Sequence, residues 1–144
     1  MEIKNKKAAF AYFLIEEFTA GMVLTGTEIK SIRAGKASLK EAYCAFTGDE
    51  LFVRNLHISP YAYGTYNNHE PKRERKLLLS ARELRKLKSK LEEKGLTLIP
   101  TLLFINEKGL AKLVIALSKG KKMYDKRDTL KKKDQQREID RRIE

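Results

Sequence analysis

The chain has 144 residues, 42% of them hydrophobic and 35% charged, and its 31 Lys and Arg against 19 Asp and Glu give a formal charge of +12. This length and apolar content fit one domain with one core, and no apolar stretch approaches the roughly 20 residues of a membrane-spanning helix. The first residues mix charges without an apolar core, so no secretory signal is predicted, and the single cysteine, Cys44, excludes an internal disulfide and fits a reducing cytoplasm.

The first predicted elements are a strand and a short helix. Residues 10–18 are rich in aromatic and branched side chains and favour a strand, which we expect Gly21 to end with a bulge or a sharp bend. Thr25 and Glu28 have the spacing of a capping box, and Gly35 is a typical C-terminal stop, so a short helix is predicted between them.

A hairpin and a loop come next along the chain. Residues 42–46 and 51–56 flank a Gly-containing turn, which predicts two antiparallel strands. Residues 57–68 combine Pro, Gly, paired Asn and three tyrosines, a composition typical of a loop.

The clearest predicted helix begins at Ser80. Ser80 and Glu83 form a second capping box, a stripe of three leucines follows, and Gly95 ends the helix. Two apolar runs, residues 96–105 and 110–117, are joined by a short Gly-containing turn and predict a second hairpin.

Together these elements predict a mainly β domain of about six strands with two or three helices. A small closed or partly open β-barrel and an α+β sandwich both remain compatible with this pattern, whereas the short connections disfavour a parallel doubly wound sheet. We expect the barrel domain to occupy residues 1–118 and a basic tail to occupy residues 119–144, where core residues become too sparse for independent folding.

The positive charge is concentrated in two blocks. Residues 1–71 carry 8 basic and 8 acidic side chains, while residues 72–94 carry 10 and 4. Residues 95–118 carry 2 and 1, and residues 119–144 carry 11 and 6. A neutral body with two basic segments indicates a polyanionic partner, most often a nucleic acid. A solvated helix and a solubilising tail are the alternative interpretation.

No pattern in the chain indicates catalysis or a metal site. The two histidines and Cys44 lack metal-ligand spacing, phosphate-loop and nucleophile-elbow motifs are missing, and the adjacent glutamates at 16–17 and 92–93 fit solvated charge. We expect His57 to be half-buried and bound to backbone rather than to RNA, and Cys44 to be a core residue. We predict no cofactor, no metal and no enzymatic activity.

Aromatic and basic residues are the candidates for binding. Of Tyr12 and Phe13, which alternate along a strand, one could present its ring to a base, although core packing is the default for both. Arg73 and Arg75 would point to one side of an extended segment, either to grip successive phosphates or to protect a sheet edge. Residues 119–127 interleave basic side chains with Gly and Tyr, which suits RNA binding, and the tail beyond them could fold on an anionic surface.

Four segments resemble the signature blocks of one family, in that family's order. They are residues 26–36 (GTEIKSIRAGK), 57–61 (HISPY), 73–79 (RERKLLL) and 120–127 (GKKMYDKR). These blocks are similar to those of the SsrA-binding protein, or small protein B (SmpB), family, and they spread over nearly the whole chain.

The resemblance implies a fold and a function. The fold would be an oligonucleotide-binding (OB-like) β-barrel flanked by helices. The function would be that of a cytoplasmic, monomeric adaptor that binds the tRNA-like domain of transfer-messenger RNA (tmRNA, SsrA RNA), one protein per RNA, without a membrane. It would bring that RNA to stalled ribosomes and replace the missing anticodon arm. Its tail would enter the empty mRNA channel and become helical at the small-subunit decoding centre, so that the nascent peptide is tagged and the ribosome is released.

The resemblance and the basic blocks also assign residues to two interfaces. The tmRNA-binding candidates are Asn5, Tyr12, Glu28, Lys30, Arg33, Lys36, Arg73, Arg75 and Lys76. The candidates for the decoding centre and its approach are Lys119, Gly120, Lys121, Lys122, Tyr124, Asp125, Lys126, Arg127, Lys131, Lys132, Lys133 and Arg137. A generic single-strand-binding OB-fold module of the cold-shock type is the alternative, and an enzyme of nucleic-acid metabolism is a third hypothesis.

Overall fold

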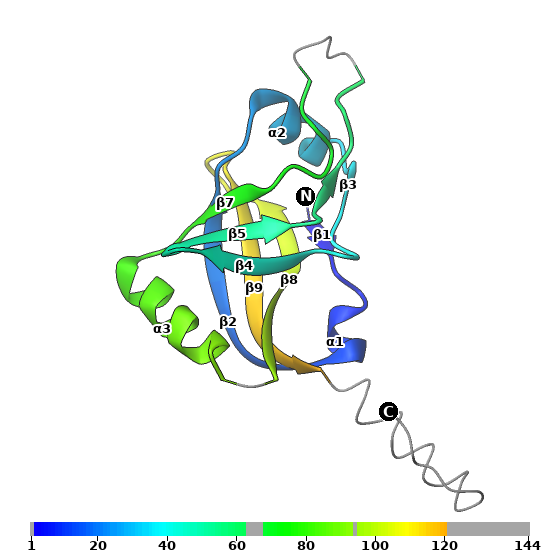
Figure 1. Ribbon diagram of the computed structural model, residues 1–144. Helices are drawn as coiled ribbons and strands as arrows, with labels where there is room; N and C mark the ends of the chain where they lie inside the picture. The colour runs from blue at the N-terminus through cyan, green and yellow to red at the C-terminus, as the bar shows by residue number, and fades with distance from the viewer. Residues whose placement is uncertain (1, 63–67, 94, 121–144) are drawn as a thin grey trace, which may run out of the picture.

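A computed structural model describes residues 2–62, 68–93 and 95–120 (Figure 1). This part of the chain is mainly β-structure with three helices. In chain order the elements are β1 (Glu2–Lys4), α1 (Ala8–Ala11), β2 (Tyr12–Met22), α2 (Gly26–Arg33), β3 (Ala37–Ser38), β4 (Tyr43–Thr47), β5 (Glu50–Arg54), β6 (His57–Ile58), β7 (Arg75–Leu78), α3 (Ala81–Leu91), β8 (Leu96–Ile105) and β9 (Ala111–Gly120).

Six strands form a closed ring. They follow the order β8, β4, β5, β7, β2 and β9, and β9 pairs back with β8. All pairings in the described residues are antiparallel, β1 lies beside β8, and β3 and β6 form a separate two-stranded sheet. The closed ring agrees with the predicted barrel rather than with the sandwich, because pairing between β8 and β9 leaves no gap in the sheet.

Both predicted hairpins are confirmed. In the first, β4 and β5 pair from Tyr43 opposite Arg54 to Thr47 opposite Glu50, around a turn at residues 48–49. In the second, β8 and β9 pair over almost their full lengths. The strand β9 continues to Gly120, two residues beyond the expected limit of the barrel, and so the root of the predicted tail begins inside the sheet.

Both predicted capping boxes are present. The Thr25 hydroxyl accepts the Glu28 N–H at 3.4 Å, and the Glu28 carboxylate accepts the Thr25 N–H at 2.9 Å. Ser80 and Glu83 make the same reciprocal pair at the start of α3, at 3.2 and 3.3 Å. Gly35, which follows α2, has a φ of 75°, a conformation that is open to glycine at little cost.

The predicted N-terminal strand is confirmed for residues 12–18, but both of its ends differ from the prediction. Phe10 lies in α1, a single helical turn rich in alanine whose Ala8 is buried, and β2 begins only at Tyr12. Gly21 does not end the strand, because its backbone pairs with Lys112 of β9 and with Leu78 of β7. The irregularity in β2 instead lies between residues 14 and 16.

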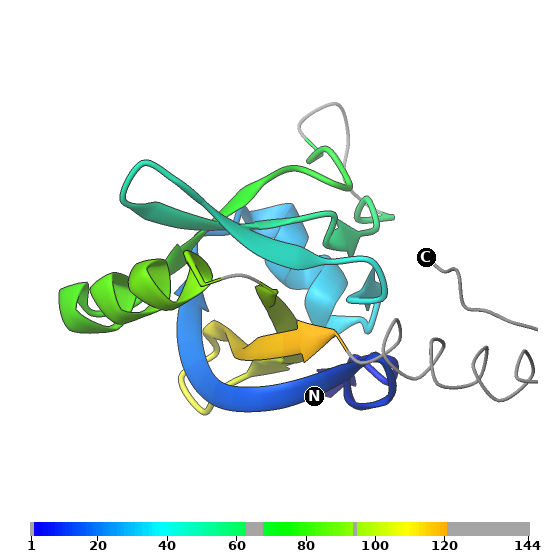
Figure 2. The ribbon, with the colours of Figure 1, turned by 60° about the horizontal axis from the view of Figure 1, so that its bottom comes forward.

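The core fills the ring and is covered by two helices. Leu51, Leu98 and Leu113 are among the fully buried residues inside the ring. Ile32 of α2 and Leu87 of α3 are also fully buried members of this core. Figure 1 shows the two helices at different ends of the ring, while Figures 1 and 2 both place α3 across the ring from α1. The polar faces of α2 and α3 therefore belong to separate surfaces.

Candidate nucleic-acid interface

A buried ion triad fixes the start of α2. The Glu28 side chain has no exposed surface, and two arginines reach it from residues more than 40 positions away. Arg73 Nη2 lies 2.7 Å from Glu28 Oε1, and Arg75 Nε lies 2.5 Å from Oε2. Arg75 also donates to the Leu56 carbonyl oxygen at 2.6 Å and to that of Pro71 at 3.0 Å. The triad therefore ties α2 to β7 and to the segment that precedes it.

The charges of this triad satisfy one another. Burial acts to raise the pKa of Glu28, but hydrogen bonds from Arg73, the Thr25 N–H and Arg75 outweigh it and lower that pKa from 4.5 to about 2. Burial lowers the pKa of Arg75, an effect that its bond to Glu28 opposes. Glu28 is thus an ionised carboxylate held by two guanidinium groups.

The triad corrects the interpretation of Arg73 and Arg75 as a phosphate clamp. The two side chains do point to one side, as their alternation predicts, but that side faces Glu28. Arg75 is fully buried and out of reach of any ligand, while the Arg73 side chain keeps 37% of its surface exposed. Glu28 is equally inaccessible. Glu28 and Arg75 can influence an RNA surface only by positioning its backbone and neighbours.

A buried histidine makes a second link to α2, which the sequence did not reveal. His69 Nε2 lies 2.9 Å from the Ile58 carbonyl oxygen, and Nδ1 lies 2.8 Å from the Thr27 hydroxyl. Because a carbonyl oxygen only accepts, Nε2 carries a proton and donates it, and in the neutral ring Nδ1 accepts from Thr27. The signal for this role was weak, since a lone histidine between Asn and Glu has no distinguishing spacing.

The exposed face of α2 and the residues after it carry free positive charge. Lys30, Arg33 and Lys36 are all exposed. The Lys30 Nζ lies 5.5 Å from the centre of the Tyr61 ring, and Arg33 Nη2 donates to the Gly109 carbonyl oxygen at 3.4 Å. These contacts leave the cations at the surface, on α2 and directly after its end. We call Lys30, Arg33 and Lys36 the α2 patch.

A second basic surface surrounds Asn5. The Asn5 side-chain amide donates to the carbonyl oxygens of Pro100 and Leu39, at 2.9 and 3.3 Å. Its Oδ1 is buried and has no hydrogen-bond partner within the described ranges. Two open hollows of about 250 and 430 Å³ adjoin this residue, and both are also lined by Lys7 and Lys40. Asn5 therefore holds the backbone between two lysine-lined hollows.

The lysines of this surface were missed in the sequence. The smaller hollow is lined in addition by Lys4 and Lys6, and the larger by Tyr12 and Tyr43. A charge sum over residues 1–71 conceals them, because eight acidic residues elsewhere in that range cancel them. The run of three lysines within residues 4–7 was the available signal. We call Lys4, Lys6, Lys7 and Lys40 the N-terminal patch.

Five further residues singled out in the sequence have the following surroundings. Tyr12 is half-buried at the larger hollow and Phe13 keeps 51% of its surface exposed, so the two rings differ as their alternation predicts, and core packing does not hold for Phe13. His57 is half-buried in β6, as predicted, and Cys44 is a buried core residue whose thiol pKa is raised by burial. Lys76 of the predicted tmRNA set forms an exposed ion pair with Glu50, at 2.7 Å.

The predicted tail meets the described structure only at its root. Lys119 and Gly120 are exposed and pair in β9 with Phe13 and Tyr12, so these two residues lie near the larger lysine-lined hollow, which Tyr12 lines. The other decoding-centre candidates lie outside the described residues. They are Lys121, Lys122, Tyr124, Asp125, Lys126, Arg127, Lys131, Lys132, Lys133 and Arg137.

The described residues contain neither a cluster of metal ligands nor a membrane-spanning helix. Within residues 2–62, 68–93 and 95–120, no group of three or more His, Cys, Asp or Glu side chains could hold a metal ion. None of the helices in the same ranges is long and apolar enough to cross a membrane.

Comparisons with known proteins agree with one another over nearly the whole chain. The family described as SmpB protein matches residues 2–144. A relative named SsrA-binding protein from Phocaeicola vulgatus is 62% identical over 141 residues, which cover 98% of this chain and 94% of the relative. One of the same name from Flavobacterium psychrophilum is 60% identical with the same two coverages.

A solved structure shares the fold. It is described as "tmRNA-SmpB: a journey to the center of the bacterial ribosome", and its matching chain is 45% identical to this one. The TM-score is 0.75, with 92% of each chain covered. The closed ring of strands with three helices is therefore the arrangement of a known RNA-associated protein, consistent with the predicted OB-like fold.

Proposed function

Because the chain belongs to the SmpB family, we propose that it binds the tRNA-like domain of tmRNA and delivers this RNA to stalled ribosomes. The observation that carries the proposal is the match to a solved chain described with tmRNA and the bacterial ribosome, at 45% identity over 92% of both chains. The relatives named SsrA-binding protein support the same partner. The exposed basic patches supply the charge that such a partner requires.

We assign tmRNA to the α2 patch and the N-terminal patch. Lys30, Arg33 and Lys36 would neutralise phosphates, and the buried triad would hold α2 in place beneath them. Lys7 and Lys40 would act in the same way at the larger hollow, where the half-buried Tyr12 offers a ring edge to a base. Glu28 and Arg75 are positioning residues in this proposal, since neither side chain reaches solvent.

We propose that the tail and its first residues, Lys119 and Gly120, contact the ribosome. Lys119 and Gly120 lie beside Tyr12 and Phe13, so a tail that continues from them would start next to the N-terminal patch. The eleven basic residues between 119 and 144 suit a channel lined by ribosomal RNA, with the decoding centre of the small subunit as the target. In this function the chain is a cytoplasmic adaptor that acts as a monomer and catalyses no step itself.

Competition binding at two salt concentrations tests this function. Full-length protein is titrated with labelled tRNA-like domain of tmRNA at 50 and 200 mM salt, and then with unlabelled poly-pyrimidine RNA as competitor. Since phosphate contacts release counterions, we expect affinity to fall by about 10³-fold for roughly six contacts, and the competitor to be ineffective. An affinity independent of salt would contradict phosphate binding by the patches. Equal competition by the unstructured RNA would favour a cold-shock-type module.

A further inference from the structure

The outward face of α3 carries arginines that the proposed function does not use. Arg82 and Arg85 are exposed, and neither forms an ion pair with any described residue. The three lysines of the same helix are all paired. Lys86 lies 2.7 Å from Glu16, Lys88 lies 2.7 Å from Asp49, and Lys90 lies 3.5 Å from Glu93. The arginines are thus the uncompensated charges of this helix.

The helix is fixed so that these arginines stay in solvent. Leu87 is fully buried, and Leu84 and Leu91 pack against the same core. Residues 82, 85 and 89 recur at spacings of three and four, which places them together on the opposite side of the helix. Ser89 is the third exposed member of that face, so no acidic residue lies at its centre.

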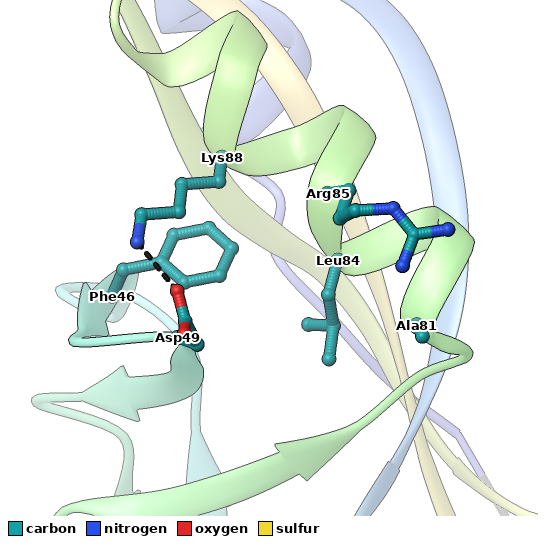
Figure 3. A pocket seen from close by; sticks show the side chains of 6 residues that line it. All are labelled: Phe46, Asp49, Ala81, Leu84, Arg85 and Lys88. Carbon is teal, nitrogen blue, oxygen red and sulfur yellow. Dashed lines mark hydrogen bonds and ion pairs between the residues drawn. The ribbon is translucent and has the colours of Figure 1, made fainter.

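A hollow lined by both apolar and charged side chains adjoins the arginine face. Its volume is about 330 Å³, and it lies between α3 and the turn of the β4–β5 hairpin. Figure 3 shows Phe46 and Asp49 on the hairpin side, and Leu84, Arg85 and Lys88 on the helix side. The ion pair between Lys88 and Asp49 joins the two sides, so the hollow is part of a fixed surface.

We propose that α3 and the β4–β5 turn bind single-stranded RNA, with Arg82 and Arg85 on successive phosphates and an unpaired base against Phe46. The planar guanidinium group bonds two phosphate oxygens at once, which a lysine cannot do. Proteins that bind single-stranded RNA combine an aromatic ring with cationic side chains, because every base has a face that can stack on the ring. Phe46 is half-buried, and Ala81 and Leu84 line the hollow beside it, so the hollow offers an apolar surface for the face of a base between its charged residues.

This surface would make the protein a bridge between two RNA molecules. In both views α3 lies across the ring from α1 and the residues of the N-terminal patch that precede it, and it is at a different end from α2 (Figures 1 and 2). An RNA on the α2 and N-terminal patches leaves α3 accessible to a second RNA. The inference rests on the proposed function for the identity of the first RNA, but the second surface stands on its own residues.

The test uses a fluorescein-labelled adenosine dodecamer as the probe. Full-length protein is first saturated with unlabelled tRNA-like domain of tmRNA, and the labelled RNA is then titrated against that complex by fluorescence anisotropy. We expect the wild type to bind the probe and the Arg82→Gln/Arg85→Gln variant to bind it about 10-fold more weakly, with a salt slope smaller by about 2. Phe46→Leu, which keeps an apolar side chain in the core, should weaken binding at least about 5-fold.

A matched variant on the same helix provides the control. Lys86→Gln/Lys90→Gln removes the same two charges from residues that are already paired, and it should change probe affinity by less than about 2-fold. All variants should retain their affinity for the tRNA-like domain and an unchanged melting temperature. The thermal measurement ensures that a loss of binding is not a loss of fold.

Several results would overturn the proposal. They are an equal effect of the two double variants, no effect of Phe46→Leu, displacement of the probe by a glutamate dodecamer, and a parallel loss of tRNA-like-domain affinity in the arginine variant. A wild type that fails to bind the tRNA-like domain contradicts the proposed function instead. In that case the dodecamer titration of the free protein still tests α3, so the two failures are distinguishable.

Discussion

The helices α2 and α3 begin with the same capping box but are held on the ring by different forces. At α2 the capping glutamate, Glu28, is buried and binds two arginines, whereas at α3 its equivalent, Glu83, remains partly exposed. The helix α3 is held mainly by leucine packing around Leu87. The buried glutamate of α2 is neutralised inside the protein, while Lys30 and Arg33 on its outer face stay exposed. At α3 the lysines form ion pairs at the surface, and Arg82 and Arg85 pair with no described residue.

The largest expected effect comes from removing the buried carboxylate. Glu28→Ala leaves Arg75 charged, buried and without its partner, so we expect a loss of about 3–5 kcal/mol in the free energy of unfolding. Urea denaturation followed by circular dichroism measures it. Glu83→Ala is the matched control, because it removes the same residue from the same position of the other capping box and should cost no more than about 1 kcal/mol. Equal losses would show that the two helices are held in the same way.

The same carboxylate should make stability depend on pH. The pKa of Glu28 is about 2 in the folded chain against an ordinary value of 4.5, so the unfolded chain binds the proton more readily. The stabilisation is therefore complete above the ordinary pKa and is lost as the pH falls from about 5 to 2, up to about 3 kcal/mol. Urea midpoints measured across this range should fall more steeply for wild type than for Glu28→Gln. Parallel curves would mean that Glu28 titrates normally in the folded protein.

The difference between the helices also explains what could be predicted from sequence. Both capping boxes are local patterns, since each joins residues three apart, and both were identified. The triad was not, because Arg73 lies 45 residues from Glu28 and comes near α2 only through the pairing of β7 with β2, the strand that leads into α2. The alternation of Arg73 and Arg75 correctly placed them on one side but contained no information about which side was buried.

The N-terminal region shows a second limit of sequence reasoning. A single helical turn such as α1 is too short to produce a periodic pattern, so the sequence assigns its last two residues, Phe10 and Ala11, to the following strand. Lys40 reaches the lysines of residues 4–7 only because the chain returns to Asn5, which binds the Leu39 carbonyl oxygen. The neutral charge sum of residues 1–71 therefore concealed a basic surface that depends on tertiary structure.

The smallest expected effect concerns the cap of α3. Ser80→Ala removes the hydroxyl that accepts the Glu83 N–H at 3.2 Å, so the first turn loses one hydrogen bond and the unfolding free energy should fall by about 1 kcal/mol. Ser89→Ala is the matched control on the same helix. Ser89 lies exposed in the last turn of α3, where alanine has the higher helix propensity, so that substitution should raise stability by a few tenths of a kcal/mol. Urea midpoints shifted in opposite directions would separate the cap from the residue type.

Because Leu84, Leu87 and Leu91 continue to hold the helix, the Ser80 variant should also keep its affinity for the tRNA-like domain, whereas Glu28→Ala should not. Loss of that affinity on removing the α3 cap would mean that the two ends of the ring are coupled.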